Sequence, residues 1–206
     1  MKDRSTEADA AGTIRRVLRE EAAALVGERG GRVHWLFMLR DGHLPYLVHR
    51  AGGEAASTAR VEISRFAAVA ASLTSDEAQD RHLGIEFGLN PSTLGRQMLM
   101  SEEEIERVVG RPESERELAE ASHSLRDELR SGKRRKITRR RARALAHRLI
   151  EHVRAACDPQ PGDTLMLVDL GYNGSAQNGI DALLAQAFDC HVAGRYLLVR
   201  ETHDSG

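Results

Sequence analysis

Two apolar segments, Val33–Leu39 and Thr164–Val168, constrain the fold of this chain more than any other feature of the sequence. Both are almost continuously apolar and are bounded by turn-forming residues, without the alternation of a half-exposed strand. A continuous apolar run is typical of a strand that is buried on both faces, as in a parallel sheet covered by helices. The sequence therefore predicts an α/β fold with a mainly parallel sheet.

The order of the remaining elements supports this prediction. Helical periodicity is expected over 8–27, 66–73 and 175–187, and further strands over 59–63 and 196–199. The strand–helix–strand order at 164–199 is one right-handed crossover unit of a parallel sheet. The stretch 75–156 contains no convincing strand. We predict a single three-layer, Rossmann-like domain over 1–206 with a helical insertion at about 75–156.

Composition narrows the class of protein. Hydrophobic residues make up 41% and charged residues 30%, which is typical of a globular chain. Thirty basic and 31 acidic residues nearly cancel, so no overall field attracts a nucleic acid or an anionic membrane. The sequence has no run of 18 apolar residues, and its first residues, MKDRSTEADA, lack a signal pattern. We expect a cytoplasmic protein with no membrane partner.

Each of the two main strands is followed by an aspartate. Arg40-Asp41-Gly42 follows the first strand, and Asp169 follows the second. Ligands of open parallel sheets bind at the carboxyl ends of the strands, so both carboxylates are candidates for a ligand site. We predict that Asp41 and Asp169 are catalytic, holding Mg²⁺ or acting as a general base.

The loop after Asp169 is suited to a phosphate group. Its glycines leave backbone N–H groups accessible, and a predicted helix begins at its end, where free N–H groups and the helix dipole favour an anion. The predicted ligand-binding residues in this region are Gly171, Tyr172, Asn173, Gly174, Ser175 and Gln177. The alternative is structural: the glycines make a tight turn and the aspartate caps a loop.

The same motifs resemble a region of large bacterial proteins of the haloacid dehalogenase (HAD) type that are associated with surface-polysaccharide genes. In that pattern one strand ends in an ARDG-like motif, a second ends in Ser-Arg, and a later strand carries Asp-x-Gly-aromatic-x-Gly-Ser/Thr-x-Gln. The matching residues are Arg40, Asp41, Gly42, Ser64, Arg65, Asp169, Gly171, Tyr172, Gly174, Ser175 and Gln177. Leu39 replaces a small residue of the pattern. The HAD nucleophile motif Asp-x-Asp-x-Thr is absent, so the resemblance does not imply phosphatase chemistry.

A weaker resemblance is to type I phosphoribosyltransferases, whose phosphate loop also follows four apolar residues and an acid. Leu170 stands where that family has a second acid, and Gly174 comes one residue early. What both resemblances imply is a phosphate cradle between a strand and a helix.

The expected function is therefore binding of a phosphorylated small molecule, a sugar phosphate or a nucleotide, at the loops after residues 39 and 168. Arg40 and Arg65 would clamp its anionic group, with Gly42 and Ser64 beside them. One alternative is a phosphoribosyltransferase-like enzyme. Another is a non-catalytic interaction module that docks a protein partner through helices 101–156.

The segment 130–143 contains nine basic residues and no acid, whereas 101–129 contains ten acids and four bases. The favoured interpretation is that the two segments pack as neighbouring helices of opposite charge, and nucleic-acid binding through 130–143 is the alternative. Thr138 is a candidate helix cap, which would place Arg139–Arg141 in a first turn that disfavours cations. Ser101 and Glu104 have the spacing of a capping box.

The histidines and cysteines carry less information. His43, beside Asp41, is a candidate acid or base, and no histidine pair has the spacing of a metal site. Cys157 and Cys190 are expected to be ordinary buried residues.

Overall fold

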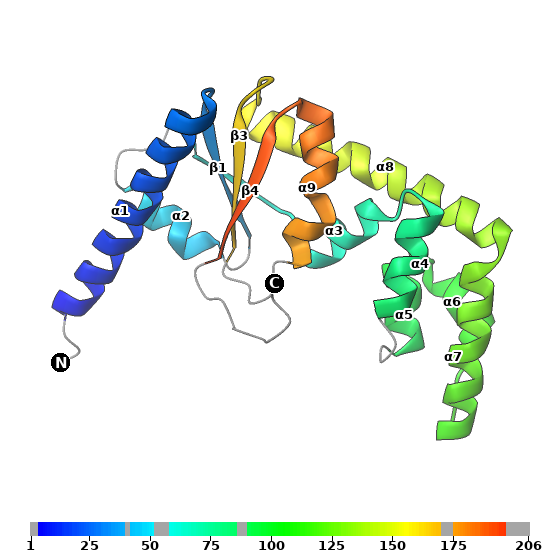
Figure 1. The fold of residues 1–206 in the computed structure, drawn as a ribbon. Helices are drawn as coiled ribbons and strands as arrows, with labels where there is room; N and C mark the ends of the chain where they lie inside the picture. The colour runs from blue at the N-terminus through cyan, green and yellow to red at the C-terminus, as the bar shows by residue number, and fades with distance from the viewer. Residues whose placement is uncertain (1–3, 40–41, 52–57, 86–89, 170–174, 197–206) are drawn as a thin grey trace. The chain divides into compact units, whose positions relative to one another are not determined.

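A computed structural model of the chain describes residues 4–39, 42–51, 58–85, 90–169 and 175–196 (Figure 1). The chain divides into two compact units. Unit 1 comprises Met1–Ser64 and Ile150–Gly206, and unit 2 comprises Arg65–Leu149.

Unit 1 is built on four strands, β1 (Val33–Met38), β2 (Thr58–Val61), β3 (Thr164–Asp169) and β4 (His191–Tyr196). All neighbouring pairs are parallel, and their order is β2-β1-β3-β4. The predicted Rossmann-like α/β fold with a parallel sheet is therefore confirmed. The fourth strand begins five residues earlier than the predicted 196–199, and residues 197–199 lie outside the described part of the chain.

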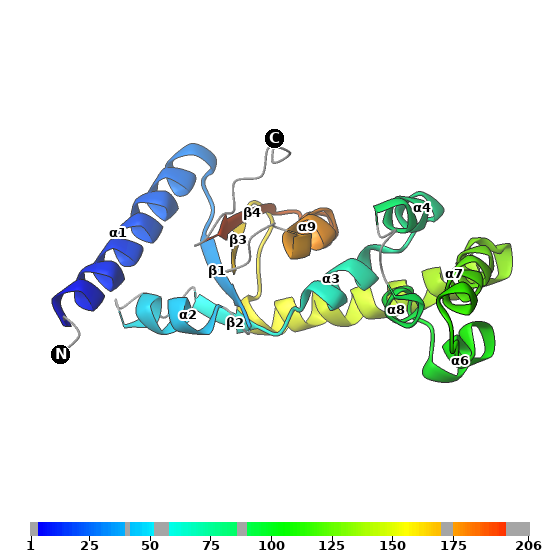
Figure 2. The same cartoon turned by 90° about the horizontal axis from the view of Figure 1, so that it is seen from below.

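Helices cover both faces of this sheet (Figures 1 and 2). On one face, α1 (Arg4–Arg29) and α2 (His43–Arg50) pack through Leu18 and Tyr46 onto Trp35, Phe37, Met166 and Val168. On the other lie α9 (Ser175–Phe188), with Ile180 and Leu184 buried, and the C-terminal part of α8 (Gly132–Cys157), with Val153 buried. The central strands are buried on both faces, which explains their continuous apolar sequences.

Tyr46 fixes α2 against the sheet. Its ring meets Phe37 edge-on at 5.8 Å, and its hydroxyl accepts a hydrogen bond of 2.8 Å from Arg50. The guanidinium of Arg60 on β2 lies 5.2 Å from the same ring. These contacts place the beginning of α2 at the carboxyl end of β1.

The amino edge of the sheet is held by a buried carboxylate. Asp163 accepts hydrogen bonds from the Arg32 and Gln160 amides, each 2.9 Å, from the Arg32 guanidinium at 3.0 Å and from His34 Nε2 at 2.8 Å. Burial opposes ionisation of this carboxyl, but these hydrogen bonds outweigh it and hold the pKa of Asp163 well below its ordinary value. The interactions join the beginnings of β1 and β3.

Among the described residues of unit 2, 65–85 and 90–149, all the regular secondary structure is helical. Unit 2 contains α3 (Arg65–Ser72), α4 (Asp76–Ile85), α5 (Pro91–Gln97), α6 (Glu102–Val109), α7 (Glu115–Arg130) and the first part of α8. Its core is formed by Leu73, Leu83, Leu94, Met98, Met100, Ile105, Leu125, Leu129 and Ala142. The predicted helical character of the middle of the chain is confirmed.

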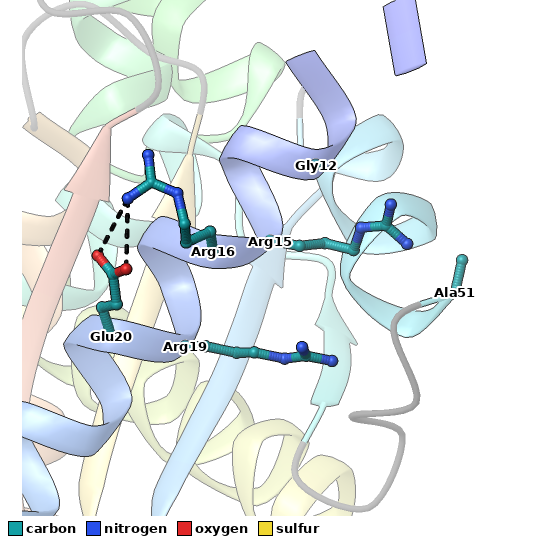
Figure 3. Close-up of a pocket in the computed structure, with 6 residues that line it drawn as sticks. All are labelled: Gly12, Arg15, Arg16, Arg19, Glu20 and Ala51. Carbon is teal, nitrogen blue, oxygen red and sulfur yellow. Dashed lines mark hydrogen bonds and ion pairs between the residues drawn. The ribbon is translucent and has the colours of Figure 1, made fainter. Parts of the chain in front are cut away.

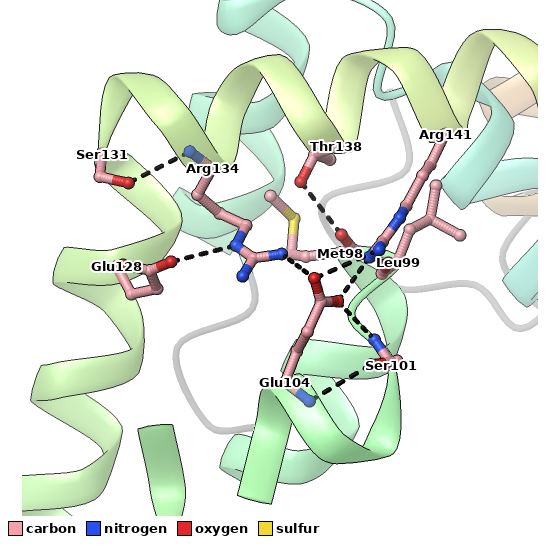
Figure 4. A network of polar contacts seen from close by, with 9 residues as sticks. All are labelled: Met98, Leu99, Ser101, Glu104, Glu128, Ser131, Arg134, Thr138 and Arg141. Carbon is pink, nitrogen blue, oxygen red and sulfur yellow. Dashed lines mark hydrogen bonds and ion pairs between the residues drawn. The ribbon is translucent and has the colours of Figure 1, made fainter. Parts of the chain in front are cut away.

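The predicted capping box at the start of α6 is also confirmed. Ser101 Oγ accepts from the Glu104 amide at 3.2 Å, and Glu104 Oε2 accepts from the Ser101 amide at 2.8 Å. The same carboxylate is bound by Arg141 and by Arg134, the latter at 2.9 Å (Figure 4). The hydrogen bonds from Arg141, the Ser101 amide and Arg134 prevail over burial and lower the pKa of Glu104 to about 2.

The prediction that Thr138 caps a helix is wrong. Helix α8 begins at Gly132, where Ser131 Oγ accepts a hydrogen bond from the Arg134 amide. Thr138 is buried inside the helix, and its hydroxyl donates to the Met98 carbonyl at 3.2 Å. Arg139–Arg141 therefore do not lie in a first turn, and the cations that do are Lys133, Arg134 and Arg135.

Acids from several helices pair with the basic segment. Arg134 and Arg141 pair with Glu104, and Arg134 also reaches Glu128, which confirms the expected contact with the acidic segment 101–129. Arg135 and Arg139 pair instead with Asp80 and Asp76 of α4, outside that segment.

The two cysteines are free thiols and are half-buried. Burial raises the pKa of Cys157 to about 12 and that of Cys190 to about 11, so neither thiol is suited to act as a nucleophile at neutral pH. None of the described helices is both long enough and apolar enough to cross a membrane.

Candidate functional site

The strand order places the two predicted motifs beside each other. The chain passes from β1 outward to β2 and then returns across β1 to form β3, so the direction of the strand order reverses between β1 and β3. The register pairs Phe37 with Val168, which brings the ends of the two strands, Met38 and Asp169, to the same height. In open α/β sheets this reversal point, at the carboxyl edge, is where ligands bind.

Asp169 is the last residue of β3 and lies at this edge. It is half-buried and is the register partner of Tyr196 on β4. Asp169 is paired with β4 on one side, and on the other side the preceding residue, Val168, is paired with β1. Its position is therefore set by the sheet and not by a loop.

Gly42 makes the turn after β1 tight. Its amide donates to the Met38 carbonyl at 2.8 Å, and it is the residue that precedes α2. A Cβ at position 42 would lie 2.6 Å from the Met38 carbonyl oxygen and 2.9 Å from the Met38 nitrogen. Since both neighbours are backbone atoms, only glycine fits. Because of this close approach, the chain reverses direction after Met38, and α2 begins next to the carboxyl end of β1.

Two helices start at the carboxyl edge. Helix α2 begins at His43, with no acid in its first turn and no side-chain cap on Gly42, and α9 begins at Ser175 after β3. Free N–H groups at a helix start favour an anion. The backbone at this edge is thus electropositive beside the Asp169 carboxylate.

The structure brings part of the Ser-Arg motif to the same edge. β2 runs parallel to β1 with Val61 opposite Met38, and the Leu39 amide donates to the Val61 carbonyl at 3.0 Å. Ser64 follows three residues later in unit 1. Arg65 is exposed and is the first residue of α3, in unit 2.

Gly42, Ser64 and Asp169 therefore lie at the carboxyl edge of one sheet. His43, which we considered as an acid or base, is exposed at the start of α2. Six of the predicted residues lie outside the described part of the chain: Arg40, Asp41, Gly171, Tyr172, Asn173 and Gly174. The backbone of Ser175 and Gln177 forms the first turn of α9.

The carboxylate of Asp169 is one ligand of the kind that Mg²⁺ prefers. This ion takes oxygen ligands and is bound in proteins through one or two carboxylates together with water and phosphate oxygens. Asp169 supplies one such carboxylate. Among the described residues, no group of three histidine, cysteine or acidic side chains is placed to hold a metal ion.

A second feature was not predicted from the sequence. An open hollow of about 530 Å³ lies between α1 and the end of α2 and is lined by Gly12, Arg15, Arg16, Arg19, Glu20 and Ala51. Arg16 turns away to pair with Glu20 at 3.3 Å, whereas Arg15 and Arg19 extend toward α2 (Figure 3). In the sequence, the spacing of Arg15 and Arg19, four residues apart on a predicted helix, already indicates that the two side chains lie on the same face. Cations beside the C-terminus of a helix stabilise that helix. This effect on α2 is enough to explain the positions of Arg15 and Arg19 without a ligand.

Comparisons with known proteins do not assign a function to this edge. The chain matches no protein-family model, and no curated protein is similar to it.

Proposed function

We propose that unit 1 binds a phosphorylated small molecule, a sugar phosphate or a nucleotide, at the carboxyl edge between β1 and β3. The observation that carries this proposal is the reversal of the strand order beside Asp169. An inner-strand carboxylate at a reversal point, next to two helix starts, combines a metal ligand with an anion-binding backbone.

In this proposal each group of residues has its own role in binding the ligand. Asp169, with Asp41, would hold Mg²⁺, which would offset the negative charge of the phosphate, or would act as a general base. Arg40 would clamp the anionic group, with the Ser64 hydroxyl beside it. The loop Gly171–Ser175 cradles the phosphate, and Gln177 adds an amide donor in the first turn of α9. The HAD-type resemblance motivates the assignment of a phosphorylated substrate, with hydrolysis or group transfer as the candidate chemistry.

The test is a thermal-shift screen of the full chain against sugar phosphates, nucleotides and phosphoribosyl pyrophosphate, with and without Mg²⁺. A ligand at 100 times its Kd stabilises the folded protein by about 2.7 kcal/mol. We expect a Mg²⁺-dependent rise in Tm that is lost in Asp169→Asn.

The matched control is Asp189→Asn. Asp189 is an exposed aspartate just before β4, at the opposite edge of the same sheet, and its φ of 51° is one that asparagine accepts readily. This variant makes the same change of charge and should keep the ligand-induced rise in Tm. A screen in which no ligand raises Tm, or in which Asp169→Asn responds like the wild type, would refute the proposal.

A further inference from the structure

Five cations of α8 remain after the ion pairs of unit 2 are accounted for, and one of them, Arg148, lies apart from the other four. The side chains of Lys133, Lys136, Arg140 and Arg143 are exposed, and they make no hydrogen bond or ion pair with any described residue. Four further arginines of α8, Arg134, Arg135, Arg139 and Arg141, are paired with acids. The basic segment therefore has a paired part and a free part.

Four of the free cations, all except Arg148, lie on one face of the helix. Their spacing of three, four and three residues places them within an arc of roughly 80° and along about 15 Å of the axis, at 3.6 residues per turn. Exposed His147 continues the row by one more turn. We call Lys133, Lys136, Arg140 and Arg143 the basic stripe.

The opposite face of α8 is occupied by the core of unit 2. Thr138, Ala142, Ala146 and Leu149 are buried, and Figure 4 shows Thr138, Arg134 and Arg141 directed from α8 toward α6 and the Met98–Leu99 turn. Arg134, Arg135, Arg139 and Arg141 are tied to acids and do not neutralise the stripe. Ion pairing thus divides the cations of α8 into a paired set and a free set, and four of the free cations form a row on the convex outer face of the helix.

The shape and composition of the stripe restrict its partner. A helix that binds a membrane surface inserts an apolar face into the lipid, but the apolar face of α8 is buried in protein. Binding to single strands uses aromatic stacking platforms, and α8 has no phenylalanine, tyrosine or tryptophan. A convex row of cations with regular spacing instead suits the evenly spaced phosphates of a duplex.

We propose that the basic stripe of α8 docks the chain on the phosphate backbone of a double-stranded nucleic acid, without reading the base sequence. Such contacts give affinity and position but carry no sequence information. The proposal is independent of the ligand site in unit 1, because it involves residues of unit 2 alone.

Counterion release gives the proposal a quantitative signature. Each neutralised phosphate contributes about −0.9 to the slope of log K against the logarithm of salt concentration. Four contacts therefore predict a slope between about −3 and −4. Affinity should fall by about a factor of ten for each doubling of salt concentration.

The experiment measures fluorescence anisotropy of a labelled 20-base-pair DNA duplex with the full chain over a series of salt concentrations. The stripe variant carries Lys133→Gln, Lys136→Gln, Arg140→Gln and Arg143→Gln. The control variant removes the same charge from other exposed positions of unit 2, through Arg81→Gln, Arg107→Gln, Arg111→Gln and Arg116→Gln. Circular dichroism establishes that both variants are folded.

We expect the stripe variant to lose affinity at least tenfold and to have a slope close to zero. The control variant should remain within about threefold of the wild type and keep its slope. The proposal is overturned if the wild type does not bind at low salt, or if the two variants lose affinity equally. It is also overturned if the stripe is needed only for binding to vesicles of anionic lipid or to a poly-glutamate peptide.

Discussion

The guanidinium of Arg134 on α8 lies 2.9 Å from the carboxylate of Glu104 on α6, and both side chains are largely buried. Thirty residues separate the two along the chain. Burial removes water from both charges, so each depends on the other for its solvation. Glu104 also completes the capping box of α6 and binds Arg141, which makes it the point at which two helices of unit 2 are joined.

Glu104→Gln should destabilise the chain by about 3 kcal/mol, because it leaves the buried Arg134 guanidinium without its main counter-charge. Urea unfolding followed by circular dichroism measures the difference in free energy. Glu103→Gln is the control: its side chain is exposed on the same turn, and its effect should stay within about 0.5 kcal/mol. Equal effects of the two variants would show that the ion pair contributes no stability.

The low pKa of Glu104 predicts how this contribution depends on pH. A carboxyl whose pKa falls on folding stabilises the folded state at pH values above its unfolded pKa. The stabilisation is lost as the pH falls through the folded value. For Glu104 the interval runs from 4.5 down to about 2, and the full contribution is about 3 kcal/mol.

The measurement is the difference in unfolding free energy between the wild type and Glu104→Gln. It should be largest at pH 6 and should shrink progressively between pH 4.5 and pH 2.5. A difference that is the same at pH 6 and pH 2.5 would mean that Glu104 does not titrate in this interval.

Gly42→Ala should destabilise unit 1, because the added Cβ would lie 2.6 Å from the Met38 carbonyl oxygen and backbone must move to accommodate it. The cost expected for forced overpacking is about 1–3 kcal/mol. Gly12→Ala in α1 is the control: no atom lies within 4 Å of its added Cβ, and alanine favours a helix. Thermal unfolding should therefore show opposite signs for the two variants. A neutral Gly42→Ala would show that the turn after β1 adapts.

Much of the fold could be predicted because the central strands carry their own signature. β1 and β3 are buried on both faces, so their sequences are apolar throughout and were located to within one residue. β4 is an edge strand with half-buried residues, and its sequence HVAGRY mixes polar and apolar side chains. The continuous apolar pattern is therefore absent where the strand begins, and only its last residue, Tyr196, was predicted.

The candidate site was predictable in part for the same reason. The position of Asp169 at the end of a buried strand follows from local sequence alone. That β1 and β3 are neighbours does not, because strand order is decided by tertiary packing. The same limit applies to unit 2. Local sequence predicted the capping box of Ser101 and Glu104, whereas the partners that Glu104 finds on α8 are more than 29 residues away.

Asp163→Asn should be among the most destabilising single changes in unit 1. The carboxylate accepts four hydrogen bonds, and an asparagine has one acceptor oxygen and would turn its amide N–H groups toward other donors. Leaving buried donors such as His34 Nε2 unpaired costs about 1–3 kcal/mol for each group. We expect a loss of about 2–4 kcal/mol in urea unfolding and faster hydrogen exchange of the Arg32 and Gln160 amides.

Asp189→Asn is the control, because Asp189 is exposed and lies at the same edge of the sheet as Asp163. This variant should change neither the urea unfolding nor the hydrogen exchange of these amides. Because the ordinary pKa of Asp163 is 3.8 and that of Glu104 is 4.5, the contribution of Asp163 should begin to fade at a lower pH than that of Glu104 as the solution is acidified. Asp163 lies at the amino edge of the sheet, opposite the candidate site. If Asp163→Asn abolished ligand-induced stabilisation while Asp169→Asn preserved it, the proposed site would be at the wrong edge.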